Sequence, residues 1–154
     1  MVRRAGVADA PGARAVIERA IRGSSRDLYS PEQIEAWAAG GCLEGVRSMI
    51  ETTAAFVAVS RGRVVGFSNL DNADVDQLYV DPDVDGTGVA RKLYDAVEHD
   101  AVEHGVATLT ATASLRAIPA FRRFGFVERG RVERPFNRAT FRVAQMVKHL
   151  RVSA

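Results

Sequence analysis

The sequence predicts an α/β fold that is built on one mixed β-sheet. Segments with strand-like and helix-like hydrophobic periodicity follow one another in the order β-α-α-β-β-β-α-β-α-β-β. Only the step from the strand at 74–80 through a helix to the strand at 107–113 is typical of a right-handed parallel crossover. With 154 residues, 47% of them hydrophobic, the chain can bury a sizeable core, and we expect a single domain over residues 1–154.

The first half of the chain contains two helix starts. Asp9 is expected to cap one of them. Ser30 and Gln33 form a capping box around Pro31 at the other, in which each side chain accepts from the backbone amide of its partner. The pattern predicts a strand at Val2–Ala5, helices at Ala10–Arg22 and Pro31–Ala39, and a short helix within 42–52.

The second half alternates strands with helices. Arg61-Gly62 is typical of a tight hairpin turn, and Gly105 marks the end of a helix that starts after a glycine-rich turn and runs to about His104. The last two strands are expected to be joined through residues 135–138, and a short helix precedes Gly125-Phe126. Strands are predicted at Ala54–Ser60, Arg63–Leu70, Asp74–Val80, Ala107–Ala113, Phe126–Arg134 and Ala139–Lys148.

The turn Gly86-Thr87-Gly88 joins a buried strand to a helix and is the most informative part of the chain. Closely spaced glycines let the backbone approach a ligand, and the first helical turn offers unpaired N–H groups and the positive end of the helix dipole. Such a turn favours a phosphate or pyrophosphate. The Rossmann fingerprint is excluded because Arg91 stands at its third glycine, and the P-loop because Gly-Lys-Ser/Thr is absent. An ordinary strand-to-helix turn is the alternative.

Gly86-Thr87-Gly88-Val89-Ala90, after Val80-Asp81-Pro82, resembles the acetyl-CoA pyrophosphate loop of the GNAT N-acetyltransferase superfamily. That loop reads Gln/Arg-x-x-Gly-x-Gly/Ala; 88–90 match its last three positions, and Asp85 replaces the usual Gln or Arg. The predicted order of elements is also similar to the GNAT fold over nearly the whole chain. The resemblance implies a mostly antiparallel sheet in which one parallel strand pair splays apart, flanked by helices on both faces.

The resemblance implies acetyl-CoA as the cosubstrate. Splayed strands leave backbone groups free to pair with pantetheine, and backbone amides there can polarise the thioester oxygen as an oxyanion hole does. The residues implied to contact acetyl-CoA are Leu78, Tyr79, Val80, Asp85, Gly86, Thr87, Gly88, Val89, Ala90, Arg91, Ser114 and Phe121.

Acetyl transfer to an amine needs a group that removes a proton from the amine. Asp76 is the first candidate and Asp74 the second, because carboxylates that enter a buried strand are costly unless they face a cleft or a partner. Desolvation there raises a carboxyl pKa toward neutral, as a general base requires. The alternative is that both carboxylates only solubilise the preceding loop.

The departing thiolate must also be stabilised or protonated. Many members of the superfamily carry a tyrosine for this in the short helix before a Gly-Phe pair, and Phe121 occupies that position here. The proton can come from solvent, since a thiolate with a pKa of about 8.5 is a tolerable leaving group. It can also come from another hydroxyl, or the protein has lost turnover. The hydroxyls in question are those of Ser114, Tyr79 and Tyr94.

Ser114, a candidate catalytic and cofactor-binding residue, ends the second strand of the splayed pair. A serine there can instead cap the following helix, but Pro119 must lie in the first turn, which moves the helix start away from Ser114. The resemblance also places the acceptor between the early helices and the last hairpin. Tyr29, Trp37 and Phe136 are therefore candidates for acceptor binding, with a purely structural role in the core as the alternative.

The composition limits the classes of partner and cofactor that we expect. The net charge of +2 does not by itself favour nucleic acid or a membrane, and no apolar run is long enough to span a bilayer. The N-terminus lacks the apolar stretch of a signal peptide, and Cys42 is the one cysteine, which excludes an intrachain disulfide. The histidines lack metal-ligand spacing, so no metal is expected. We expect a cytoplasmic protein; a homodimer is possible.

The leading interpretation is an N-acetyltransferase that moves an acetyl group from acetyl-CoA to a primary amine. The amine would attack directly in a ternary complex, since Cys42 lies far from the motif region in the sequence and no other nucleophile is evident. The alternative is a non-catalytic acyl-CoA-binding regulatory or sensor module, which Phe121 and Asp85 favour. A third possibility, an interaction domain without a cofactor, is disfavoured by the glycine loop. The acceptor amine cannot be deduced from the sequence.

Overall fold

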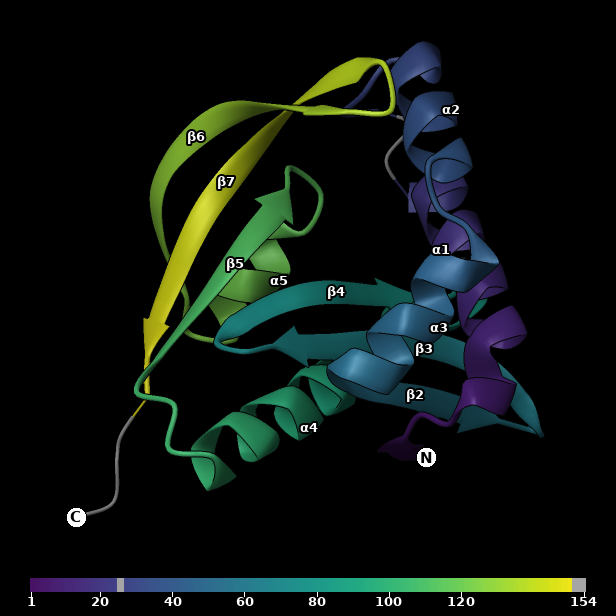
Figure 1. The fold of residues 1–154 in the computed structure, drawn as a ribbon. Coiled ribbons are helices and arrows are strands. Elements are labelled where there is room, and N and C mark those ends of the chain that lie inside the picture. Colours follow the sequence, from purple (N-terminus) through teal and green to yellow (C-terminus); the bar gives the residue numbers. More distant parts are fainter. Residues whose placement is uncertain (25–26, 151–154) are drawn as a thin grey trace.

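The computed structural model describes residues 1–24 and 27–150, which form a seven-stranded mixed sheet with helices on both faces (Figure 1). The strand order is β1-β2-β3-β4-β5-β7-β6. β4 and β5 run parallel, and the other neighbouring strands pair antiparallel. The strands are β1 (Val2–Arg4), β2 (Ala54–Ser60), β3 (Arg63–Asp71), β4 (Asp74–Val80), β5 (Thr108–Ser114), β6 (Val127–Phe136) and β7 (Ala139–His149).

The helices divide between the two faces of the sheet. One face is covered by α1 (Ala10–Ser24), α2 (Pro31–Ala39) and α3 (Leu43–Thr52), and the other by α4 (Val89–Glu103) and α5 (Ile118–Arg123). Alternation along β2 shows the division, because successive side chains of a strand point to opposite faces. Val57 packs with Ala10 and Ala13 of α1, whereas Ala58 packs with Leu93 of α4. The fold class predicted from the sequence is thus confirmed.

The two helix starts differ in outcome. At α2 the capping box forms as predicted: Gln33 N donates to Ser30 Oγ at 3.1 Å, and Ser30 N donates to Gln33 Oε1 at 2.8 Å. Asp9, predicted to cap α1, instead lies in a 3₁₀ turn (Val7–Asp9), where its Oδ2 accepts from Gly6 N at 2.8 Å. The prediction that Asp9 caps α1 was therefore wrong. Arg3 also pairs with this carboxylate at 2.8 Å and holds it away from α1.

β6 runs two residues further than predicted, so Pro135 and Phe136 belong to the strand and not to the connection. Only Asn137 and Arg138 form the turn, both with positive φ, 45° and 69°. Proline fits here because β6 is the edge of the sheet, where a missing N–H removes no ladder hydrogen bond. Within the described residues, no helix has both the length and the apolar character that crossing a membrane requires.

Candidate active site

The parallel ladder between β4 and β5 stops after two residue pairs, Asp74 with Thr110 and Val75 with Ala111. Both strands continue, β4 paired with β3 and β5 paired with β7 as far as Ser114. The ladder stops at a β-bulge, since the register of β3 passes from Val75 to Gln77 and leaves Asp76 as the extra residue of β4. Past this bulge the two parallel strands splay apart, as the family resemblance implies.

Backbone polar groups of both strands face the resulting gap. Asp81 N donates to Val65 O of β3, and antiparallel pairing alternates, so the peptide groups of Leu78 and Val80 point away from β3 toward β5. Tyr79 pairs with β3 through its backbone. On the other strand Thr110 N donates to Ala73 O of the loop before β4, so by the same alternation the peptide groups of Thr112 and Ser114 face the gap. An extended ligand can bind these groups as a strand would.

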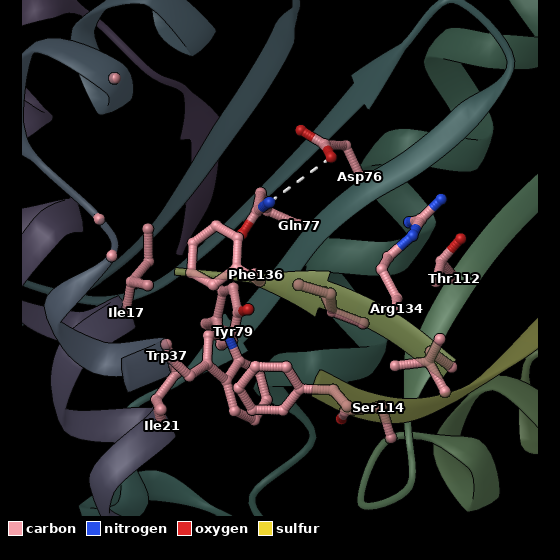
Figure 2. A pocket seen from close by; sticks show the side chains of 18 of the residues that line it. Ile17, Ile21, Trp37, Asp76, Gln77, Tyr79, Thr112, Ser114, Arg134 and Phe136 are labelled. Atoms are coloured by element: carbon pink, nitrogen blue, oxygen red, sulfur yellow. Dashed lines mark hydrogen bonds between the residues drawn. The ribbon is translucent and has the colours of Figure 1, made fainter. Parts of the chain in front are cut away.

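A cavity of about 510 Å³ adjoins this gap and receives side chains from both faces of the sheet (Figure 2). Trp37 of α2 lines it from one face, and Phe121 of α5 lines it from the other. The predicted site residues that line the cavity are Tyr29, Trp37, Asp74, Asp76, Leu78, Tyr79, Ser114, Phe121 and Phe136. The structure thus brings these predicted residues around one space.

The glycine loop lies between β4 and α4. Gly86 and Gly88 have φ of 79° and 88°, a left-handed conformation that favours glycine, and no heavy atom lies within 4 Å of a Cβ built on either residue. Gly88 is the N-cap of α4, whose first turn begins at Val89 and contains no acidic residue. Open space, positive φ and the unpaired first-turn N–H groups together fit a pyrophosphate. The other residues of the loop that were predicted to contact acetyl-CoA lie beside these glycines: Thr87 between them, and Ala90 and Arg91 in the first turn of α4.

Asp85 is partly neutralised. Its Oδ1 accepts from Gly86 N at 3.1 Å, and its Oδ2 lies 3.9 Å from Arg116 Nη2. Arg116 follows Ser114 in the β5–α5 loop, and sequence reasoning missed it. The signal was available, because the carboxyl ends of two parallel strands lie at the same edge of a sheet. A cation two residues beyond β5 could therefore have been placed near the glycine loop, although it was not.

Asp81 fixes the chain between β4 and the glycine loop. Its carboxylate is fully buried, accepts from Arg19 Nη1 of α1 at 2.6 Å and from Asp83 N at 2.9 Å, and lies 3.7 Å from Arg63. The following 3₁₀ turn, Pro82–Val84, leads directly into the loop. A buried carboxylate with these partners holds the loop in one place relative to α1.

The two candidate bases have different surroundings. Asp74 is half-buried, its Oδ1 accepts from Thr110 Oγ1 at 2.7 Å, and burial raises the pKa of its carboxyl above the usual value. Asp76 is exposed to the cavity; its Oδ2 accepts from Asn69 Nδ2 at 3.1 Å, and its Oδ1 lies 3.5 Å from Gln77 Nε2 (Figure 2). Asn69 is fully buried and orients the Asp76 carboxylate.

Asp74→Asn is expected to raise the melting temperature at pH 7. Because burial raises the pKa of folded Asp74 above 3.8, the folded state binds this proton more tightly than the unfolded state, and ionisation costs stability. The cost is absent below pH 3.8 and complete above the folded pKa, so the gain should disappear in acid. Thermal melts at about pH 3.5 and pH 7 measure it, with Glu51→Gln on the exposed side of α3 as the control. Equal gains at both pH values would contradict the assignment.

The hydroxyl groups proposed to protonate a thiolate lie in different places. Ser114 Oγ forms no hydrogen bond with another described residue and lines the cavity, and α5 has Ala117 as its N-cap, so Ser114 does not cap that helix. Burial raises the pKa of the Tyr79 phenol to about 12, which keeps its proton at neutral pH. Tyr94 is absent from the described cavity lining, and its ring stacks on Phe124 at 4.4 Å in the core.

Phe121, at the position of the family's tyrosine, is buried and packs edge-to-face on Phe126 at 5.1 Å between ring centroids. Among the other predicted residues, Tyr29 donates through its hydroxyl to Arg142 O at 2.7 Å and accepts from Leu115 N at 3.0 Å. Those bonds hold the end of β5 against β7. Only the ring of Tyr29 is therefore presented to the cavity.

The β6–β7 hairpin curves toward α2 (Figure 1), and Arg134, Pro135 and Phe136 of β6 line the cavity. Asn137 Nδ2 donates to Ala36 O at 2.8 Å, and Gln33 Nε2 donates to Thr140 O at 2.7 Å. Phe136 packs so closely on Gly40 that a Cβ there would overlap its ring. The hairpin and α2 thus form one wall of the cavity, which contains Trp37 and Phe136.

Some residues of the cavity were missed or misjudged. Arg14 and Arg134 line it, and nothing in their sequence surroundings distinguishes them from surface arginines. Cys42, judged too distant in the sequence, lines it as well and caps α3 through its Sγ, which accepts from Gly45 N at 3.3 Å. Within the described ranges, no group of three or more His, Cys, Asp or Glu side chains is placed to hold a metal ion.

Comparison with known proteins agrees with this geometry. Residues 26–150 match the family described as an acetyltransferase (GNAT) domain. The chain is 33% identical over 123 residues to YafP of Escherichia coli K12, described as an uncharacterized N-acetyltransferase, and the match covers 77% of each protein. The crystal structure of a GCN5-related N-acetyltransferase from Rhodopseudomonas palustris is similar with a TM-score of 0.93 at 32% identity, covering 97% of this chain and 95% of that one.

PaiA N-acetyltransferase from Thermoplasma acidophilum, solved in complex with coenzyme A, shares the fold with a TM-score of 0.76 at 15% identity, over 97% of this chain and 98% of that one. The glycine loop and the gap between β4 and β5 both lie within residues 26–150, the part of the chain that matches the family. The chain belongs to the GNAT acetyltransferases and is an acetyl-CoA-dependent acyltransferase.

Proposed function

We propose that this enzyme transfers the acetyl group of acetyl-CoA to a primary amine by direct attack within a ternary complex. One observation carries the proposal: the cavity beside the β4–β5 gap receives two carboxylates, Asp74 and Asp76, and side chains from both faces of the sheet. The thioester and the amine can therefore meet at the gap from opposite sides, with a base beside them.

The groups around the β4–β5 gap have separate roles in this mechanism. The N–H groups at the start of α4 bind the pyrophosphate, and the peptide groups of Leu78 and Val80 hold the pantetheine arm and polarise the thioester oxygen. Asp76 binds the ammonium form of the acceptor and takes its proton, directly or through water. The amine nitrogen then bonds to the acetyl carbon and loses its second proton to solvent as the carbon–sulfur bond breaks, and the thiolate takes a proton from Ser114, Tyr79 or solvent.

Asp76 is favoured over Asp74 as the base because of its place. It lies at the bulge where the strands part, whereas Asp74 lies where the ladder is still closed and already accepts from Thr110. We expect Asp76→Asn to lower kcat/KM about 100-fold or more, the usual contribution of a general base, and Asp74→Asn to lower it less than about 10-fold. Thiol release from acetyl-CoA measures both. A larger loss in Asp74→Asn would transfer the role to Asp74.

The test of the function itself is calorimetric titration with acetyl-CoA and CoA, followed by thiol release on a panel of amines. Binding with acetylated amine as the product supports the proposal, and binding without turnover on any amine would favour the sensor module instead. Because Cys42 lines the cavity, Cys42→Ser separates direct attack from an acetyl-cysteine intermediate. Direct attack predicts that this variant keeps its turnover and that initial-velocity plots intersect; lost turnover with parallel plots would contradict it.

A further inference from the structure

The cavity contains few charged side chains. Among the described residues that line it, the charged ones are Arg14, Asp74, Asp76 and Arg134. Arg14 lies 3.6 Å from Glu18 on the same helix, so its charge already has a partner. Two carboxylates and one guanidinium remain to meet a ligand.

Arg134 projects from β6 into the cavity. Figure 2 shows its side chain directed from the strand toward the part of the cavity that holds Asp76 and Thr112. Its charge acts on the carboxyl of Asp74 and opposes the rise of that pKa. Its guanidinium nevertheless forms no ion pair or hydrogen bond with any residue in the described part of the chain. A guanidinium in this situation is suited to bind a carboxylate of the ligand, for which its planar fork is matched.

Most of the remaining wall is aromatic and aliphatic. Trp37 lies 5.9 Å from Phe141 and 6.4 Å from Tyr79 between ring centroids, and Ile17 and Phe136 extend the same surface. An apolar side chain of aromatic size fits against these rings, which also favour edge-to-face contact. A polyamine or an aminoglycoside would instead need further carboxylates, and the described lining has only two.

We infer that the acceptor is a free α-amino acid with an aromatic side chain. Its ammonium would lie by Asp76 and Asp74, its carboxylate on Arg134, and its ring against Trp37 and Phe136. An α-amino acid carries the two opposite charges one carbon apart, which matches carboxylates and a guanidinium that share one end of a cavity. The inference rests on the proposed function and specifies its substrate class. The product would be the N-acetyl amino acid, with the α-nitrogen acylated and CoA released as the thiol.

Three probes that differ only in the carboxylate test this inference. They are L-phenylalanine, its amide, which imitates a peptide N-terminus, and phenethylamine, which lacks the group. We expect kcat/KM for L-phenylalanine to exceed that for the other two by about 10- to 100-fold, the range of one charge-assisted pair. Arg134→Gln should remove this preference, so that kcat/KM for L-phenylalanine falls to about that for phenethylamine in the same variant. Arg129→Gln, an exposed arginine of the same strand outside the described cavity lining, should retain the preference.

The outcomes separate the two levels of the proposal. Turnover of phenethylamine without a preference for L-phenylalanine leaves the N-acetyltransferase standing and overturns the amino acid inference. A better rate with the amide overturns it in favour of a peptide N-terminus. An equal loss on all three probes in Arg134→Gln overturns it too, because the arginine then acts on something other than the carboxylate. No turnover of any probe overturns it outright. Calorimetric titration of L-phenylalanine into the CoA complex supplies a readout independent of turnover, and wild type should bind it more tightly than Arg134→Gln.

Discussion

Replacing Gly88 by valine should reduce the affinity for acetyl-CoA by about 100-fold or more. The pyrophosphate is expected to accept two or more charge-assisted hydrogen bonds from the start of α4, each worth about 1.5–3 kcal/mol, and about 3 kcal/mol corresponds to 100-fold. A valine side chain would occupy the open space in front of these N–H groups and would be strained at a φ of 88°. Calorimetric titration with acetyl-CoA measures the loss.

Gly62→Val is the matched control for Gly88→Val. Gly62 lies in the β2–β3 turn, has a φ of 74°, and likewise has no heavy atom within 4 Å of a Cβ built on it. Both variants incur a similar backbone strain of about 1–2 kcal/mol, so their melting temperatures should fall alike. Only Gly88→Val should lose its affinity for acetyl-CoA. Wild-type affinity in Gly88→Val would mean that the pyrophosphate binds elsewhere.

Arg19→Met should destabilise the fold far more than the loss of an exposed ion pair does. The variant leaves the fully buried Asp81 carboxylate with the amide of Asp83 and with Arg63 at 3.7 Å, in place of a 2.6 Å ion pair. Breaking a buried pair from one side costs about 3–5 kcal/mol, which lowers the melting temperature of a protein of this size by about 6–20 °C. Thermal and urea unfolding measure the change.

Arg22→Met, one helical turn further along α1, controls for the loss of an arginine from this helix. Arg22 pairs with Glu18 and Glu35 near the surface, and exposed pairs contribute at most about 1 kcal/mol. Methionine keeps the helix propensity in both variants. If the two substitutions lower the free energy of unfolding equally, the pair of Arg19 with the buried Asp81 carboxylate does not stabilise the fold as its burial indicates.

Element order could be predicted because local signals determine it. The capping box at Ser30 and Gln33 needs only residues three positions apart, and it forms as predicted. Asp9 could not be assigned in the same way, since Arg3 competes for its carboxylate through the tertiary contact of β1 with the turn before α1. The end of β6 was misplaced at Pro135 because proline is excluded from interior strands, and the edge position of β6 follows only from the sheet order.

The conformation of the glycine loop could be predicted and the lining of the cavity only in part, for a similar reason. A loop that requires positive φ leaves glycines in the sequence, and Gly86 and Gly88 both adopt that conformation. Arg134 and Cys42 come to the cavity through the arch of the β6–β7 hairpin and the α2–α3 connection, whose courses depend on long-range packing. No local pattern distinguishes them from surface residues.

The extra residue in β4, Asp76 at the bulge, determines which sequence changes would keep the gap between β4 and β5 open. Substituting Asp76 changes the chemistry offered at the bulge but keeps the count of residues, so Val75 and Gln77 still face different neighbours and the strands still diverge. Deleting one residue from the bulge would restore the regular alternation of side chains along β4 and let β4 pair with β5 over a longer stretch. The opening therefore depends on the number of residues in β4 and not on which side chains they carry. Substitutions that keep the length of β4 should therefore preserve the opening between β4 and β5, even where they change the chemistry at Asp76.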